Sequence, residues 1–143
     1  GTRWATRVVA AGAHPPIQTP CGKVRAMRLL ICEDNALVAL ELREEAARRG
    51  IDRIVVVADS DDALHAMEGG GFDAAVVDLH LEDGRSGPRI ARRLAECGVH
   101  VVVLSGGVLQ CDELADASHI FIRKPTPADI VIDCAALGFA CPT

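Results

Sequence analysis

The sequence predicts a single α/β domain built on a doubly wound parallel sheet of five strands. Short apolar runs rich in Val, Ile and Leu alternate with longer segments whose apolar residues recur at helical spacing. Uninterrupted apolar runs are typical of strands buried on both faces, and alternation with helices favours parallel crossovers. The 143 residues fit one domain large enough to bury a substantial core.

Five apolar runs predict the strands. They are residues 29–32, 54–57, 74–78, 100–104 and 120–122. Helical spacing between them predicts five helices. The first spans residues 35–49, the second carries Ala63, Leu64 and Met67, the third carries Ile90, Ala91 and Leu94, a weak fourth lies near residues 109–117, and the last follows residue 126.

Capping residues mark two of the helix starts. Ser60 or Asp61 can cap the second helix. Thr126 is expected to cap the last helix, with Pro127 at its first position and Asp129 completing a capping box.

Charge divides the chain into two parts. Residues 1–26 carry a net charge of +4, which leaves −9 on the remainder, for a total of −5. We interpret residues 1–26 as a flexible basic extension or a tail added in cloning, and residues 27–143 as the folded domain. An acidic domain is a poor direct binder of nucleic acid. No apolar run approaches the roughly 18 residues of a membrane span, and no secretory signal is evident.

The six cysteines predict free thiols. None forms a Cys-x-x-Cys pair, and Cys32, Cys97 and Cys134 lie within strand or helical patterns, where we expect them to be isolated and buried. Isolated thiols fit a reducing compartment better than a disulfide framework or a zinc site, so we expect a cytoplasmic protein.

Polar side chains follow four of the expected strands. They are Glu33 and Asp34 after the first, Asp78 at the end of the third, Ser105 after the fourth and Lys124 after the fifth. Parallel strands place their C-terminal ends on one edge of the sheet, where ligands bind in such folds. Three carboxylates packed together repel one another unless a cation joins them, and oxygen-only ligands suit Mg²⁺.

The remaining groups at this edge suit a phosphoryl group. Lys124 and Ser105 can complement phosphate oxygens, and Gly106 leaves backbone amides accessible as further donors. Asp78 could itself be the nucleophile and form an aspartyl phosphate, with its charge balanced by Mg²⁺ and Lys124.

With these residues in this order, the segment from about Arg28 to Leu137 resembles the receiver domains of two-component response regulators. The resemblance implies a flavodoxin-like fold and transfer of a phosphoryl group from a histidine kinase's phosphohistidine to Asp78. It also implies that Mg²⁺ is held by Asp34, Asp78 and the backbone carbonyl of His80, with Glu33 binding mainly through water. The segment DLHLEDGRSG further resembles receivers associated with histidine kinases of the HWE type.

The resemblance matches Phe121 to the family's switch aromatic, which would turn inward when Ser105 moves toward the phosphoryl group. A core aromatic is the alternative interpretation of Phe121. Phe replaces the commoner Tyr, and the stretch between Ser105 and Lys124 is shorter than usual for the family. The His80 side chain is expected to shape access to the phosphate, and Asp34 could also cap the following helix.

We therefore predict a single-domain response regulator that is not an enzyme in its own right. Its expected partners are a sensor histidine kinase or phosphotransfer protein and an output protein that the sequence does not identify, with no nucleic acid and no membrane insertion. A phosphorylation-independent binding scaffold is the main alternative. A phosphatase of the haloacid dehalogenase type is disfavoured, because that class needs an Asp where this chain has His80.

Overall fold

Strand β3 (Ala74–Asp78) is the middle strand of a five-stranded, all-parallel sheet with the order β2-β1-β3-β4-β5. The computed structural model describes residues 27–81, 86–106, 114 and 119–136. The other strands are β1 (Arg28–Cys32), β2 (Arg53–Val57), β4 (His100–Ser105) and β5 (Ile120–Arg123). The five predicted strands are confirmed to within one residue at each end.

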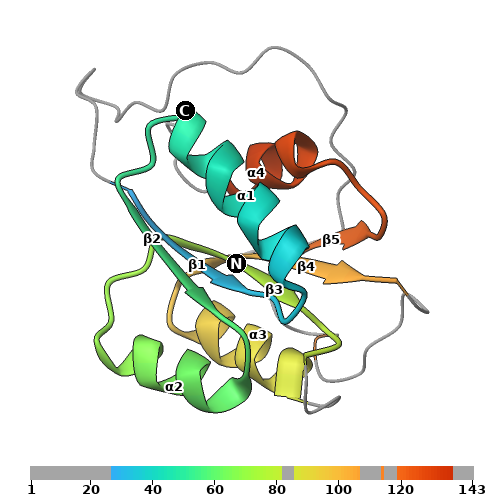
Figure 1. Ribbon diagram of the computed structural model, residues 1–143. Helices are drawn as coiled ribbons and strands as arrows, with labels where there is room; N and C mark the ends of the chain where they lie inside the picture. Colours follow the sequence, from blue (N-terminus) through green and yellow to red (C-terminus); the bar gives the residue numbers. More distant parts are fainter. Residues whose placement is uncertain (1–26, 82–85, 107–113, 115–118, 137–143) are drawn as a thin grey trace, which may run out of the picture.

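Four helices within the described residues cover the two faces of the sheet. They are α1 (Ala36–Arg48), α2 (Ser60–Glu68), α3 (Ser86–Glu96) and α4 (Ala128–Ala136). Helices α1 and α4 lie together on one face, and α2 and α3 on the other (Figure 1). The weak helix predicted near residues 109–117 lies outside the described residues except for Leu114, which is buried. None of the described helices has the length and apolar character needed to cross a membrane.

Alternation along the central strands divides the core into two layers. Leu29 and Ile31 of β1 pack with Val76 of β3 beneath α1 and α4. Leu30 of β1 and Val77 of β3 point the opposite way, into the layer beneath α2 and α3. All five residues of β3 are buried, so Asp78 is carried to the edge of the sheet by a strand enclosed on both sides.

Strand β2 lies at the edge of the sheet and is less covered. The side chains of Val55 and Val56 are 36% and 38% exposed. Its apolar run therefore reflects β-propensity more than burial.

Three predicted helix caps are wrong. Helix α1 is capped by Asn35, whose Oδ1 accepts from the amides of Leu37 and Val38, and not by Asp34. Helix α2 is capped by Asp59, whose Oδ1 accepts a hydrogen bond of 2.8 Å from the amide of Asp62, because Asp59 is the last extended residue before the helix. At α4, the Thr126 hydroxyl donates to the carbonyl of Arg123 instead of accepting from the helix. The carbonyl of Pro127 accepts from the amide of Val131, so the helix begins one residue later than predicted.

The cysteines depart in one respect from expectation. Cys32 and Cys134 are buried free thiols, as predicted, but Cys97 is exposed. It follows the last residue of α3, beyond the face of that helix that packs on the sheet. The other three cysteines lie outside the described residues, as do residues 1–26.

Arg49, which follows the last residue of α1, joins α1 to α4. Its guanidinium lies 3.0 Å from Glu45 and 2.6 Å from Asp133, and donates to the carbonyl of Asp129 at 2.9 Å. The side chains of Arg49 and Asp133 are only 10% and 11% exposed, so this ion pair is better shielded than a surface pair. It holds α4 against the C-terminal end of α1.

Gly87 lets α3 approach the strand that carries Asp78. A Cβ at this position would lie 2.5 Å from the carbonyl oxygen of Leu79 and 2.6 Å from that of Asp78. Both contacts are with backbone atoms, which cannot rotate out of the way as a side chain could. The absence of a side chain at residue 87 therefore helps to set the position of the segment that follows β3.

We expect Gly87→Ala to lower the free energy of unfolding by about 1–3 kcal/mol, because the added methyl group forces the chain apart. Gly69→Ala is the matched control, since residue 69 has helical backbone angles and its nearest contact is an ordinary 3.4 Å. It should change stability by less than about 0.5 kcal/mol. Urea unfolding followed by circular dichroism measures both, and equal effects would contradict this role of Gly87.

Candidate functional site

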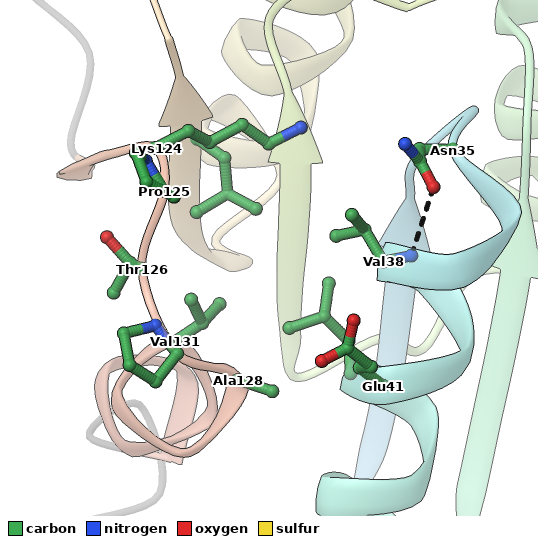
Figure 2. Close-up of a pocket in the computed structure, with 11 residues that line it drawn as sticks. Asn35, Val38, Glu41, Lys124, Pro125, Thr126, Ala128 and Val131 are labelled. Carbon is green, nitrogen blue, oxygen red and sulfur yellow. Dashed lines mark hydrogen bonds between the residues drawn. The ribbon is translucent and has the colours of Figure 1, made fainter.

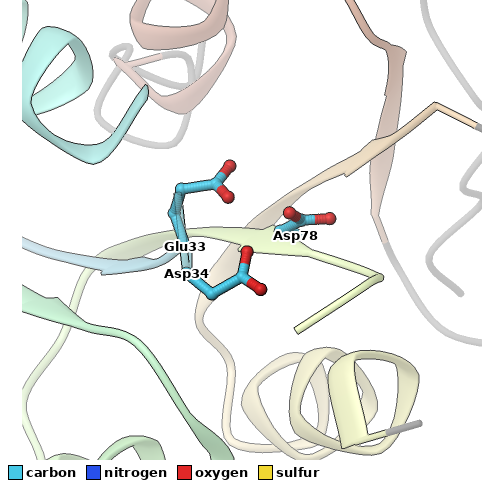
Figure 3. Close-up of side chains that lie close together, drawn as sticks. All are labelled: Glu33, Asp34 and Asp78. Carbon is cyan, nitrogen blue, oxygen red and sulfur yellow. The ribbon is translucent and has the colours of Figure 1, made fainter. Parts of the chain in front are cut away.

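The C-terminal ends of four parallel strands bring the predicted site residues together. Asp78 ends β3, Ser105 ends β4, and Lys124 directly follows β5. Glu33 and Asp34 follow β1, the neighbour of β3, and Figure 3 shows their carboxylates beside that of Asp78.

The three carboxylates form one acidic cluster. Glu33, Asp34 and Asp78 each offer an oxygen, and these oxygens lie within 4.8 Å of one another. Glu33 and Asp78 are buried, with exposed fractions of 2% and 3%, whereas Asp34 is exposed. The cluster thus has two shielded members and one that faces solvent.

Lys124 connects the two buried carboxylates. Its Nζ lies 3.0 Å from Oδ2 of Asp78 and 3.0 Å from Oε1 of Glu33. Its backbone amide donates to the carbonyl of Ser105 at 2.9 Å, which ties it to the end of β4. Burial alone would lower the pKa of Lys124, but its interactions with the two carboxylates outweigh burial and raise it. Lys124 is therefore a firmly protonated cation.

Glu33 and Asp78 differ sharply in acidity. Burial and the hydrogen bond with Asp78 raise the pKa of Glu33 to about 7. Burial opposes ionisation of Asp78 too, but hydrogen bonds from Glu33, the amide of His80 and Lys124 outweigh it and lower its pKa. Near neutral pH the metal-free pair therefore tends to hold one proton, on Glu33, while Asp78 stays ionised.

The donor set fits a divalent cation. Oε1 of Glu33 is buried, with the ammonium of Lys124 at 3.0 Å, and Oε2 accepts from the amide of Asn35 at 3.1 Å. Two buried carboxylates that share one ammonium, beside a third carboxylate, form a place where a further cation would be stabilised. Oxygen ligands with one side open to water are what Mg²⁺ prefers.

His80, which follows β3, and Ser105, which ends β4, lie on the same side of the site. The amide of His80 donates to Oδ1 of Asp78 at 2.9 Å, and its ring Nε2 lies 3.4 Å from Oγ of Ser105. Sequence reasoning expected the His80 ring only to shape access, and missed this contact because no local pattern reveals where the ring points. Gly106 is exposed beside Lys124, with room around its Cα.

Phe121 lies in the core rather than on the surface. Its side chain is 7% exposed and belongs to the layer that also contains Val103 and Leu114. The burial agrees with the interpretation of Phe121 as a core aromatic, and its role as a switch stays a prediction.

A groove of about 670 Å³ opens beside Lys124, between α1 and the segment that joins β5 to α4 (Figure 2). Its walls are mainly apolar and include Val38, Leu42 and Val131. The sequence did not predict this groove, because it depends on how α1 and α4 pack.

The chain is similar to several known regulatory proteins. No family model matches the chain. The chain is 36% identical over 88 residues to the transcriptional regulatory protein TcrA of Mycobacterium tuberculosis, covering 59% of this chain and 32% of TcrA. It is 32% identical over 127 residues to the sensory/regulatory protein RpfC of Xanthomonas campestris pv. campestris, covering 80% of this chain and 17% of RpfC. The matched part therefore spans about a third or less of these relatives.

Several solved structures of response regulators are similar to this chain. A CheY-like response regulator receiver domain from Methylobacillus flagellatus is 28% identical, with a TM-score of 0.61 over 73% of this chain and 91% of that one. The PhyR stress response regulator is 25% identical, with a TM-score of 0.63 over 81% of this chain and 45% of that one. A receiver protein from Sinorhizobium medicae, at 20% identity and a TM-score of 0.69 over 82% and 97% of the two chains, shares the fold. The predicted flavodoxin-like architecture is confirmed.

The raised pKa of Glu33 predicts a pH-dependent stability in chelator. The folded state holds the Glu33 proton up to about pH 7, whereas the unfolded chain releases it near 4.5, so the free energy of unfolding should fall as pH rises between these values. Urea unfolding over this range tests it. Glu33→Gln should remove this part of the slope, and an unchanged slope in the variant would contradict the assignment to Glu33.

The acidic cluster predicts a Mg²⁺ site that depends on Asp34. Asp34→Ala should weaken Mg²⁺ binding at least about tenfold, because even the loss of an outer partner of a metal ligand costs that much. Asp52→Ala removes an exposed carboxylate that precedes β2, at the opposite end of that strand from the cluster, and should leave binding unchanged. Isothermal titration of chelator-treated protein with Mg²⁺ measures both; equal affinities in the two variants would argue against the site.

Proposed function

Because the chain belongs to the receiver domains of response regulators, the signalling domains of two-component systems, we propose that Asp78 is its phosphoacceptor. The donor would be the phosphohistidine of a sensor histidine kinase or a phosphotransfer protein. The observation that carries the proposal is the position of Asp78, which is buried, ionised and in contact with Lys124 beside two further carboxylates.

The chemistry is a transfer of one phosphoryl group. A carboxylate oxygen of Asp78 attacks phosphorus, forming an O–P bond as the N–P bond of the donor breaks, and the nitrogen keeps the electron pair and takes up a proton. Asp78 suits this role because its lowered pKa keeps it ionised at neutral pH. Water later hydrolyses the acyl phosphate, which breaks the O–P bond, releases inorganic phosphate and restores the carboxylate of Asp78.

Lys124 and Ser105 provide the remaining contacts. The ammonium of Lys124 already lies at Oδ2 of Asp78, so it is placed to neutralise charge on an incoming phosphoryl group. Ser105 is buried at the adjacent strand end, and the amide of Gly106 follows it. We assign both to the phosphoryl oxygens.

Glu33, Asp34, Asp78 and the backbone carbonyl of His80 would hold Mg²⁺. When bound, the ion would supply positive charge against the transferring phosphoryl oxygens. The fit rests on the close approach of the three carboxylates, two of which are buried and share the single ammonium of Lys124.

The surface beside the site suits a protein donor. The apolar groove next to Lys124 is bordered by α1, which also exposes Leu37 and Leu40 at 65% and 51%. An apolar surface next to an acceptor carboxylate favours docking of another protein.

We assign the chain no enzymatic activity beyond accepting and losing its own phosphoryl group. A phosphatase of the haloacid dehalogenase type remains disfavoured, because His80 contacts Ser105 and no second Asp stands at that position. Action as a stand-alone regulator, a cytoplasmic location and a link to HWE-type kinases stay predictions from the sequence.

Intact mass spectrometry tests the proposal. With Mg²⁺ and phosphoramidate, the wild type should gain one phosphoryl group, and Asp78→Asn should gain none. Asp52→Asn serves as the control, because it removes a carboxylate of the same type before the start of β2, at the opposite end of that strand from the site.

An adduct on Asp78→Asn would show that the acceptor is another residue. Absence of an adduct on the wild type, both with phosphoramidate and with purified histidine kinases, would favour the phosphorylation-independent scaffold.

A further inference from the structure

His80 is held at the mouth of the site by its neighbours. Leu79 and Leu81 on either side are 6% and 2% exposed and pack into the layer beneath α2 and α3, so His80 between them faces outward and is exposed. The amide of Leu79 donates to the carbonyl of Leu104 at 2.9 Å. The segment after β3 is thereby attached to β4 one residue before Ser105.

The residue contacts both the acceptor and the hydroxyl next to it. Its amide donates to Oδ1 of Asp78, and its ring Nε2 lies 3.4 Å from Oγ of Ser105. Ser105 is 1% exposed, so few positions are open to its hydroxyl. The 3.4 Å separation is long for a hydrogen bond, so the contact adds little to the stability of the fold.

The direction of this hydrogen bond matters. A serine hydroxyl has one proton and two lone pairs, and a neutral imidazole nitrogen either donates or accepts. If Nε2 accepts, it takes the proton of Ser105. If Nε2 carries hydrogen and donates, it fills a lone pair and leaves the Ser105 proton for another acceptor.

We propose that His80 is a positioning residue whose Nε2–H donates to Oγ of Ser105 and directs the hydroxyl proton toward the phosphoryl group on Asp78. The inference rests on the proposed function, and it assigns the His80 side chain a role separate from that of its backbone carbonyl. The ring acts through Ser105 and need not touch the phosphoryl group itself.

The first test is spectroscopic and needs neither metal nor phosphate. In chelator-treated protein at alkaline pH, ¹⁵N NMR of the His80 ring should show the tautomer with hydrogen on Nε2. Ser105→Ala should shift the Nε2 signal. A ring with hydrogen on Nδ1, or a signal that Ser105→Ala leaves unchanged, would overturn the proposal.

The second test measures phosphorylation by phosphoramidate at saturating Mg²⁺. His80→Ala should slow it about tenfold, less than the ~10²-fold that misplacing a catalytic group costs. His80→Gln places an amide N–H near the Nε2 position and should recover most of the rate. His80→Asn is the matched control, because its shorter amide reaches only the Nδ1 position and should stay slow.

A double-mutant cycle separates positioning from a general effect on the fold. His80→Ala should have no further effect in a Ser105→Ala background, because the ring acts only through that hydroxyl. Additive losses, or equal rates for the Gln and Asn variants, would contradict the proposal. Failure of the wild type to be phosphorylated at Asp78 would instead refute the proposed function, while the NMR experiment would still decide whether the contact exists.

Discussion

The site depends on one interaction, the ammonium of Lys124 held between the carboxylates of Glu33 and Asp78. Two buried acids side by side are unstable as a pair of anions, and one positive charge at 3.0 Å from each makes their proximity tolerable. The charge of Lys124 does not fully offset the burial of Glu33 and its contact with Asp78, since the pKa of Glu33 stays raised. The negative charge that Lys124 leaves uncompensated favours binding of a divalent cation and, with it, transfer of a phosphoryl group to Asp78.

The fold supplies the remaining constraints. Strand β3 is enclosed by neighbours on both sides, so Asp78 has little freedom at its base. Gly87 lets α3 approach the backbone that follows β3, and Arg49 holds the C-terminal end of α1 against α4. The chemistry is therefore carried by side chains on strand ends, each positioned by buried apolar packing below it.

Most of the site was predictable because it follows from strand order in a parallel sheet. Asp78 and Lys124 each come directly after an apolar run, and parallel strands must bring such positions to one edge. The helix caps were less predictable, because Asp59, Ser60 and Asp61 are all good capping residues and only the backbone angles decide among them. The exposure of β2 depends on which strand lies at the edge, which composition does not specify. The ring contact of His80 and the burial of Phe121 depend on side-chain directions that no periodicity encodes.

The most direct test of the central interaction is the ionisation of Glu33 itself. Carboxyl ¹³C NMR of metal-free protein should show one glutamate that titrates near pH 7, absent from Glu33→Gln. In Asp78→Asn the pKa of this group should fall toward its ordinary value, because the neighbouring anion is gone. If every glutamate of the metal-free wild type titrated near 4.5, the carboxylates would not be packed as described, and the proposed cation and phosphoryl site would lose its basis.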